Sequence, residues 1–152
     1  MEPKGPAVGI KVSARSDAGR IRETNEDAFA VTELETGKII EIVGTDYITQ
    51  VGTRGILLAL SDGMGGHQAG EVASALVLES LRAELEGDSE PRGQLHEQLE
   101  HAVRRANTRV HEAAKASEHQ GMGATLTAVL IRGTEAYIAE VGDSRAYLLR
   151  SH

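Results

Sequence analysis

The chain has 152 residues, of which 40% are hydrophobic and 26% are charged, a balance that favours one globular domain over residues 1–152. Its formal net charge of −7 argues against nucleic-acid binding, because an acidic surface repels a phosphate backbone. The absence of cysteine excludes disulfides, thiol nucleophiles and zinc–thiolate sites. No apolar run approaches the roughly 20 residues of a membrane helix, and residues 1–6 lack the apolar stretch of a signal peptide. We therefore expect a cytoplasmic protein with no membrane partner.

The first part of the chain is predicted to be rich in β-structure. Five runs of β-favouring residues are expected as strands, over residues 8–12, 28–32, 39–43, 47–51 and 55–60. The third and fourth runs flank Gly44, Thr45 and Asp46, which predicts a hairpin between them. The fifth run is almost continuously apolar, which is typical of a strand buried on both faces.

Two long helices are predicted next. A stripe of apolar residues with a 3.6-residue period covers residues 69–86, and a second one begins at Leu95 and reaches Ala113. Charged residues fill the opposite sides, so we interpret both helices as cover for a sheet rather than as binding surfaces. Three more strands are expected, over residues 125–131, 136–141 and 146–149.

This order of strands, two helices and further strands predicts a layered α+β domain rather than alternating βαβ units. The sequence stops at His152, directly after the last predicted strand. We therefore expect a fold that is incomplete at its C-terminus, with a truncated sheet edge through which two chains could self-associate.

Asp62 is the first candidate for a functional residue. It follows a predicted buried strand, and Gly63, Gly65 and Gly66 then allow the backbone to turn and its carbonyls to approach an ion. A carboxylate and a carbonyl are hard oxygen ligands, which suit Mg²⁺ or Mn²⁺. The alternative is a glycine-rich turn in which Asp62 caps the next helix.

Three charged residues before the second predicted strand form another candidate group. Arg22 can grip a phosphate with two parallel hydrogen bonds. The adjacent acids Glu26 and Asp27 can hold metal-bound waters. The alternative is a solvated run of charges from Arg20 to Asp27.

Asp143 repeats the arrangement of Asp62, since it follows a predicted strand through Gly142. The alternative here is an Asx turn with Ser144. Taken together, the sequence has carboxylates at several strand ends, an arginine suited to phosphate, and no cysteine or serine nucleophile motif. This combination favours attack of a metal-activated water on phosphorus.

Four motifs occur in order over about residues 12–150. They are Ser16-Asp17-Ala18-Gly19 through Arg22 to Asn25-Glu26-Asp27-Ala28, then Ser61-Asp62-Gly63-Met64-Gly65-Gly66-His67, then Gly121-Met122-Gly123-Ala124-Thr125, and finally Val141-Gly142-Asp143-Ser144-Arg145-Ala146-Tyr147. This set resembles the bacterial branch of the PPM-type phosphatases, the protein phosphatase 2C family. The resemblance implies a layered α-β-β-α sandwich.

The resemblance also implies roles for single residues. Asp62 would bridge two Mg²⁺ or Mn²⁺ ions, and the carbonyl of Gly63 would ligate one of them. Glu26 and Asp27 would hold metal-bound waters, and Arg22 would bind the substrate phosphate. Asp143 matches a position that contributes to a third, weaker metal site. Some family members carry a candidate acid, a His two residues after the bridging Asp, but that position is Met64 here, so His67 receives no such role.

The implied activity is that of a protein serine/threonine phosphatase, which acts on phosphoproteins made by Ser/Thr kinases. In such a family the domain continues beyond the Gly-Asp-Ser-Arg motif, into a second Ser-Asp-Gly motif and an Asp-Asn motif that this sequence does not contain. Two alternatives therefore stay open. One is a catalytically inactive phosphatase-like module that binds a phosphoprotein or assembles with a partner chain. The other is a Mg²⁺-dependent phosphoesterase of small molecules.

Overall fold

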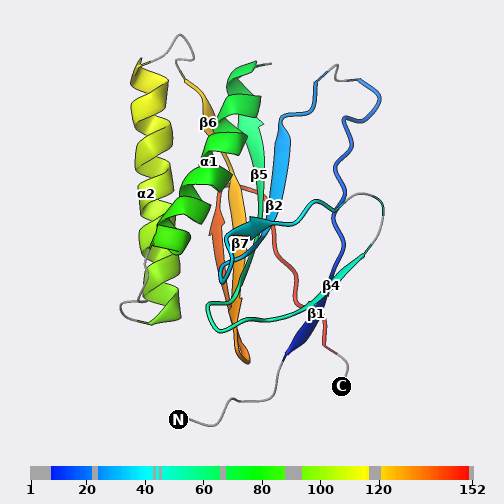
Figure 1. Cartoon of the computed structure of the whole chain (residues 1–152). Helices are drawn as coiled ribbons and strands as arrows, with labels where there is room; N and C mark the ends of the chain where they lie inside the picture. The colour runs from blue at the N-terminus through cyan, green and yellow to red at the C-terminus, as the bar shows by residue number, and fades with distance from the viewer. Residues whose placement is uncertain are drawn as a thin grey trace.

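A computed structural model describes residues 8–21, 24–42, 44, 46–65, 68–87, 94–116 and 121–150. They form a main sheet of six antiparallel strands and a small sheet of two (Figure 1). The main sheet has the spatial order β3 (Lys38–Ile39), β2 (Asp27–Glu33), β5 (Ile56–Met64), β7 (Leu126–Arg132) and β8 (Glu135–Val141), and β6 (Gly123–Ala124) pairs with the end of β5. The small sheet consists of β1 (Gly9–Val12) and β4 (Tyr47–Gln50).

Two long helices, α1 (Gln68–Gly87) and α2 (Leu95–Ala116), lie side by side on one face of the main sheet (Figure 1). Alternate residues of each strand point toward them, because strand side chains alternate between faces. In the core that results, Leu81, Ala128 and Leu130 are 0% exposed. The interpretation of both helices as cover for a sheet is therefore confirmed. Within the described residues, neither helix is both long and apolar enough to span a membrane.

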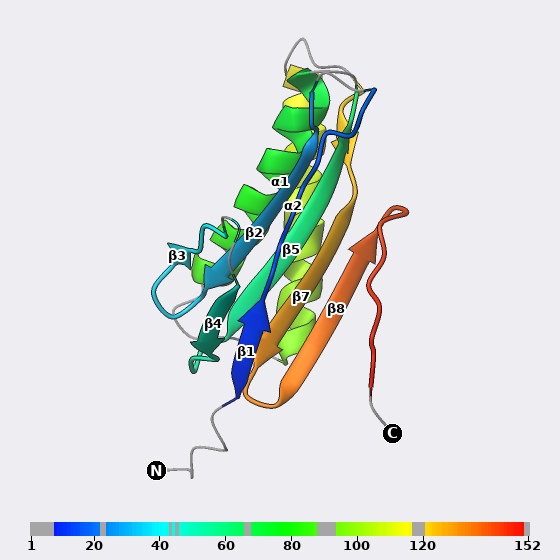
Figure 2. The ribbon, with the colours of Figure 1, turned by 90° about the vertical axis from the view of Figure 1, so that its right-hand side faces the viewer.

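The small sheet lies against the other face of the main sheet (Figure 2). Ile10, Val12 and Tyr47 pack there against the buried side chains of Val31 and Ile56. The molecule is thus layered, with the helices, the main sheet and the small sheet in that order.

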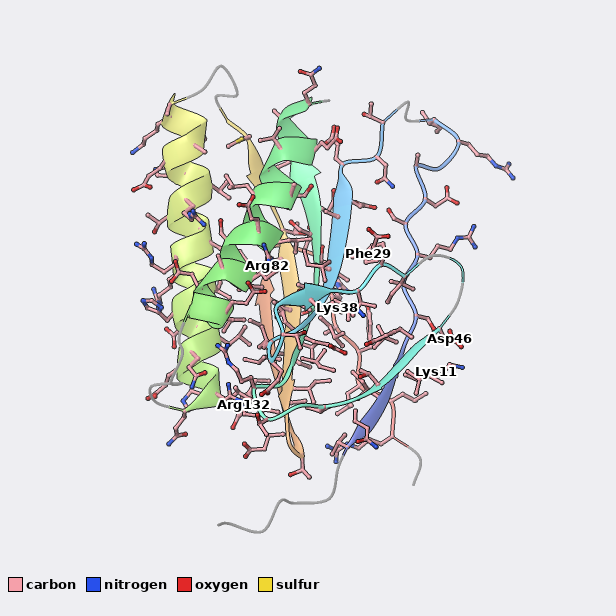
Figure 3. All side chains as sticks on the ribbon, in the orientation of Figure 1. Lys11, Phe29, Lys38, Asp46, Arg82 and Arg132 are labelled. Carbon is pink, nitrogen blue, oxygen red and sulfur yellow. The ribbon has the colours of Figure 1, made fainter. Side chains whose placement is uncertain are left out.

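The small sheet is fastened at one end by Asp46, which lies beside Lys11 (Figure 3). Lys11 forms an ion pair with the Asp46 carboxylate, and the hydroxyl of Ser13 donates a hydrogen bond to it. Both contacts lower the pKa of Asp46, with Lys11 as the larger cause. They also help to fix the segment that follows β1, which continues toward the start of β2.

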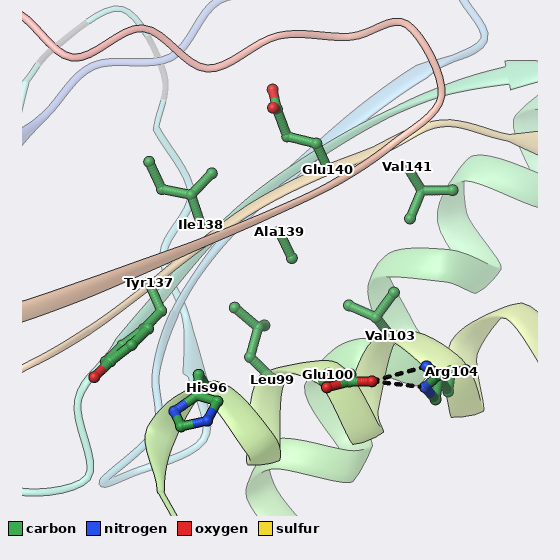
Figure 4. Close-up of a pocket in the computed structure, with 10 residues that line it drawn as sticks. All are labelled: His96, Leu99, Glu100, Val103, Arg104, Tyr137, Ile138, Ala139, Glu140 and Val141. Carbon is green, nitrogen blue, oxygen red and sulfur yellow. Dashed lines mark hydrogen bonds and ion pairs between the residues drawn. The ribbon is translucent and has the colours of Figure 1, made fainter.

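The far edge of the main sheet is formed by β8. A pocket of about 280 Å³ lies between this strand and α2, with Leu99, Val103 and Tyr137 in its lining (Figure 4). At its rim, Arg104 donates two hydrogen bonds to the Glu100 carboxylate, at 2.8 and 3.0 Å. The pocket is therefore a groove between helix and sheet edge whose rim is charged.

Most predicted elements are confirmed within one or two residues, but the predicted hairpin over residues 39–43 and 47–51 is wrong. The strand at Lys38–Ile39 pairs with β2, and the strand at Tyr47–Gln50 pairs with β1, from a distant part of the sequence. The physical reason is packing, because Tyr47 and the apolar residues of β1 together cover the buried side chains of Val31 and Ile56.

Two further expectations are corrected. The strand expected to end before Asp62 continues to Met64, since Gly63 and Met64 pair with β6. Its first residues are buried on both faces, as expected, since Ile56 and Leu57 are each 1% exposed, whereas Leu60 further along is 44% exposed. The expected strand over residues 146–149 is not formed, because no described segment forms a ladder with these residues.

Candidate metal centre

The main sheet places Asp27 and Asp62 directly opposite each other. Asp27 is the first residue of β2, and in the antiparallel register with β5 its partner is Asp62. Directly opposed residues point to the same face, with Cβ atoms about 4.5–5.5 Å apart. Both residues are exposed, on the face opposite the helices. Strand pairing thus joins two carboxylates that come from separate sequence motifs.

These two carboxylates line a pocket of about 440 Å³ on that face. The segment after β1 and the segment after β8 complete the lining, together with neighbouring strand residues: Ser13, Ala14, Arg15, Ser16, Ala28, Phe29, Leu60, Ser61 and Ser144. Arg15 brings a positive charge to this lining. Its side chain is largely exposed, and its Nη2 lies 3.3 Å from Oδ2 of Asp17. The pocket therefore combines two acids with hydroxyls and one guanidinium.

The backbone of Asp62 is fixed by Thr125. The Asp62 N–H donates to the Thr125 hydroxyl at 3.0 Å, and the Thr125 N–H donates to the Asp62 carbonyl at 2.9 Å. The buried Ser61 hydroxyl also donates to the Thr125 carbonyl, at 2.6 Å. The Thr125 hydroxyl in turn lies 2.7 Å from that of Ser144. Thr125 and Ser144 belong to the motifs named above but received no role from the sequence, because their partners are distant along the chain.

A second set of hydrogen bonds positions Asp27. Its N–H donates to Oδ1 of Asn25 at 3.0 Å, which forms an Asx turn. The Asn25 amide donates to the Ser16 hydroxyl at 2.6 Å, and this hydroxyl lies 3.5 Å from Oδ2 of Asp27. Hydrogen bonds within the first motif of the sequence thus hold the Asp27 carboxylate in the lining of the pocket.

Glu26 and Asp27 are adjacent in sequence but reach different places. The Glu26 carbonyl accepts a hydrogen bond from the Gly63 N–H at 3.1 Å. Its carboxylate lies against the first turn of α1, where an added Cβ on Gly70 would be 2.2 Å from Oε2. Glu26 is therefore on the helix side of the sheet, whereas Asp27 faces the pocket.

Asp143 lies just after β8 and is exposed. It lines a different pocket, of about 500 Å³, together with Met64, Gly123 and residues of α2. Its neighbour Ser144 lines the pocket of Asp27 and Asp62. The structure thus brings Asp143 to the same end of the sheet as Asp27 and Asp62, but into the pocket that residues of α2 line.

Arg22 and His67 lie outside the described residues. The predicted phosphate contact of Arg22 therefore stays a prediction. The assigned roles of Glu26, Asp27, Asp62, Gly63 and Asp143 stay predictions as well, now with defined positions.

The residues present fit part of a metal site. Asp27, Asp62 and the Gly63 carbonyl are hard oxygen donors, which Mg²⁺ and Mn²⁺ prefer. Within the described part of the chain, no group of three or more His, Cys, Asp or Glu side chains is arranged to hold a metal ion. With so few protein ligands, an ion bound here would keep several waters, as Mg²⁺ commonly does in proteins.

The chain is similar to known phosphatases along nearly its whole length. The serine/threonine protein phosphatase PstP of Mycobacterium tuberculosis is 42% identical over 142 residues, which are 93% of this chain and 23% of that protein. The crystal structure of the M. tuberculosis serine/threonine phosphatase PstP/Ppp superposes with a TM-score of 0.64 at 37% identity, over 95% of this chain and 50% of that one. The PstP catalytic domain in complex with two manganese ions gives a TM-score of 0.63, also at 37% identity, over 95% of this chain and 51% of that one.

The family model for protein phosphatase 2C matches residues 22–152. The chain therefore belongs to the protein phosphatase 2C family, which confirms the resemblance of its four motifs. The solved structures confirm the predicted layered α and β fold. The chain spans 23% of the length of PstP and about half of the crystallised phosphatase chains.

Proposed function

We propose that this chain forms part of the catalytic domain of a metal-dependent protein serine/threonine phosphatase. The observation that carries the proposal is the cross-strand pair of Asp27 and Asp62 at the mouth of a pocket, in a chain of this family. The substrates are proteins phosphorylated on serine or threonine by kinases, and the place of action is the cytoplasm. Pairing of two chains through an open sheet edge remains a separate prediction, which sedimentation velocity tests.

Each site residue has a proposed task. Asp62 and the Gly63 carbonyl offer oxygen ligands to divalent ions, and Asp143 contributes to a further, weaker ion site. Glu26 and Asp27 accept hydrogen bonds from waters and so orient them. When bound, Mg²⁺ or Mn²⁺ supplies a water of lowered pKa and offsets negative charge. The two manganese ions in the PstP catalytic domain support a two-ion site.

The remaining tasks concern the substrate. Arg22, through its guanidinium, holds the phosphate by parallel hydrogen bonds. Thr125 acts indirectly, because its two hydrogen bonds to the Asp62 backbone fix the direction of the carboxylate. Such fixed placement matters because positioning of reactants accounts for a large part of catalysis.

The test is turnover of a phosphothreonine peptide by the full-length protein with Mn²⁺ and with Mg²⁺. We expect activity that EDTA abolishes and that thiol reagents leave unchanged, since the proposed nucleophile is a metal-bound water and not a thiol. Asp62→Ala should reduce kcat/KM by more than about 100-fold, beyond the usual cost of losing an outer partner of a metal ligand. Activity that survives EDTA, or that Asp62→Ala leaves intact, would overturn the proposal.

A second function is favoured by one observation. Within the described residues no group of three metal-binding side chains comes together, so a phosphatase-like module that only binds phosphoproteins is the alternative. Calorimetric titration of Mn²⁺ separates the two. Binding of two ions supports the enzyme, whereas absent binding together with retained phosphopeptide affinity supports the module.

A further inference from the structure

Two glycines bring the backbones of β5 and α1 into direct contact. A Cβ built on Gly63 would lie 1.9 Å from the carbonyl oxygen of Gly70 and 2.4 Å from its carbonyl carbon. Both positions are buried. No side chain fits between these backbones, so the first turn of α1 lies directly on the strand residue whose carbonyl is proposed as a metal ligand.

Glu26 occupies the space that glycine leaves at position 70. A Cβ on Gly70 would lie 2.2 Å from Oε2 of Glu26 and 2.7 Å from its Cδ. The Glu26 backbone is tied to the same place, because its carbonyl accepts the Gly63 N–H at 3.1 Å. The carboxylate therefore rests on the bare face of the first turn of α1.

Helix propensity does not explain a glycine at position 70. The residue lies within α1 and does not have a positive φ, so any L-residue can adopt its backbone conformation. In a helix, alanine is more favourable than glycine, because glycine loses more backbone entropy on folding. The reason for glycine here is therefore steric. The Glu26 carboxylate makes the closest approach to an added Cβ, and the carbonyl carbon of Gly63 follows at 3.1 Å.

The other end of α1 is also held. The Arg54 guanidinium donates to the carbonyls of Leu85 and Glu86, at 3.1 and 3.0 Å, and so satisfies the C-terminal turn of the helix. An added methyl group at position 70 would thus meet a helix fixed at both ends. The end of the Glu26 side chain is flexible, so the carboxylate would move instead of the helix.

We propose that Gly70 is a positioning residue, which holds the Glu26 carboxylate against the first turn of α1, next to the proposed metal ligand Gly63. The inference rests on the proposed function, in which Glu26 orients metal-bound water. Gly70 touches neither substrate nor metal in this account. It acts through Glu26. Its contact with Gly63 keeps the first turn of α1 close to β5, so that the helix can contact the Glu26 carboxylate.

The test uses Gly70→Ala in the full-length protein, with Gly87→Ala as the matched control. Gly87 lies at the other end of the same helix, and nothing lies within 4 Å of a Cβ built there. For Gly70→Ala we expect a melting temperature close to that of the wild type, because the gain in helix propensity offsets the tight contact of the new methyl group with the Gly63 carbonyl carbon. We expect Mn²⁺ binding weakened about 10- to 100-fold by calorimetry, with a matching loss of kcat. Gly87→Ala should leave Mn²⁺ binding and kcat unchanged.

A double-mutant cycle with Glu26→Ala shows whether the effect passes through Glu26. If it does, Gly70→Ala adds no further loss of Mn²⁺ affinity once the carboxylate is gone. Additive losses, or Gly70→Ala with wild-type Mn²⁺ affinity, overturn the inference. Should Gly70→Ala fail to fold, the double variant must fold again, and its failure to do so also overturns the inference. The proposed function fails separately, by absence of metal-dependent activity in the wild type.

Discussion

The helices close one face of the main sheet, whereas the small sheet covers the other face only in part. On the face under the helices, Leu57 and Leu130 are at most 1% exposed. On the other face of the same strands, Leu60 is 44% exposed and adjoins the pocket of Asp27 and Asp62. Because side chains alternate along a strand, β2 and β5 serve both faces at once. The closed face supplies the stability of the fold, and that rigidity allows the open face to hold charged groups in place.

The largest effect on stability is expected on the closed face. Leu130→Ala should lower the free energy of unfolding by about 2–5 kcal/mol, since it leaves a cavity in a tightly packed core. Leu60→Ala, on the open face, should cost only about 1 kcal/mol, because this side chain is far from fully buried in the native state. Urea denaturation measures both. Equal losses of unfolding free energy would contradict the conclusion that the face under the helices supplies most of the stability.

A smaller effect on stability is expected at Thr125, which holds the backbone of Asp62. Thr125→Val removes the hydroxyl that accepts the Asp62 N–H and should cost about 1–3 kcal/mol of stability. Phosphatase activity should fall with it, because the Asp62 carboxylate loses a fixed direction.

Thr127→Val is the matched control for this change. The Thr127 hydroxyl is buried and has no hydrogen-bond partner among the described residues, so its removal should be neutral or stabilising. Denaturation curves of the two variants, measured side by side, decide the matter. A Thr127→Val protein as unstable as Thr125→Val would contradict a specific contribution of the hydrogen bond between Thr125 and Asp62.

A third prediction concerns Tyr47 in the small sheet and the pH dependence of its contribution to stability. The Tyr47 hydroxyl donates to Oε1 of Glu33 at 2.6 Å and is the largest cause of a lowered Glu33 pKa, below its ordinary value of 4.5. A lowered carboxyl pKa stabilises the fold above the unfolded-state pKa, and this contribution is lost as the pH falls through the folded-state value. Tyr47→Phe should therefore cost about 0.5–1.5 kcal/mol at pH 7.

The cost of Tyr47→Phe should shrink as the pH falls through the lowered folded-state pKa of Glu33 and this carboxylate becomes protonated. Chemical denaturation at pH 7 and near pH 3 measures the two differences. An unchanged difference between wild type and variant would mean that Tyr47 contributes by packing against the sheet, not through Glu33.

The smallest effect is expected on the outer side of α2. Arg104 and Glu100 form an ion pair with side chains 76% and 61% exposed, at the rim of the groove beside β8 (Figure 4). Arg104→Ala should change stability by no more than about 0.5 kcal/mol, since exposed pairs are weak. Thermal denaturation at low and high salt checks this. A large, salt-sensitive loss would mean that α2 depends on its surface charges.

The helices could be predicted from the sequence because their signal is local. The apolar stripe over residues 69–86 became α1 (Gln68–Gly87) almost without change. The hairpin failed for the opposite reason. Residues 39–43 and 47–51 are both β-rich, but the partner of Tyr47 is Val12, far away in the sequence, and that pairing depends on packing against the main sheet.

The residues of the candidate site could be predicted from the sequence, but their arrangement in space could not. The motifs identified Asp27 and Asp62, and strand register then showed them to be direct neighbours. That Glu26 turns toward α1 could not be foreseen, because the space for it exists only where Gly70 meets Gly63. Contacts between residues distant in sequence, such as that of Thr125 with Asp62, likewise follow from the fold.

The register between β2 and β5 also protects the site against errors in assembly. A slip of one residue would turn Asp62 toward the leucines beneath the helices, at the cost of burying a carboxylate in an apolar core. Correct packing of the core therefore requires the strand register that places Asp27 and Asp62 opposite each other. Register, and not the length of the connection between β2 and β5, therefore keeps Asp27 beside Asp62.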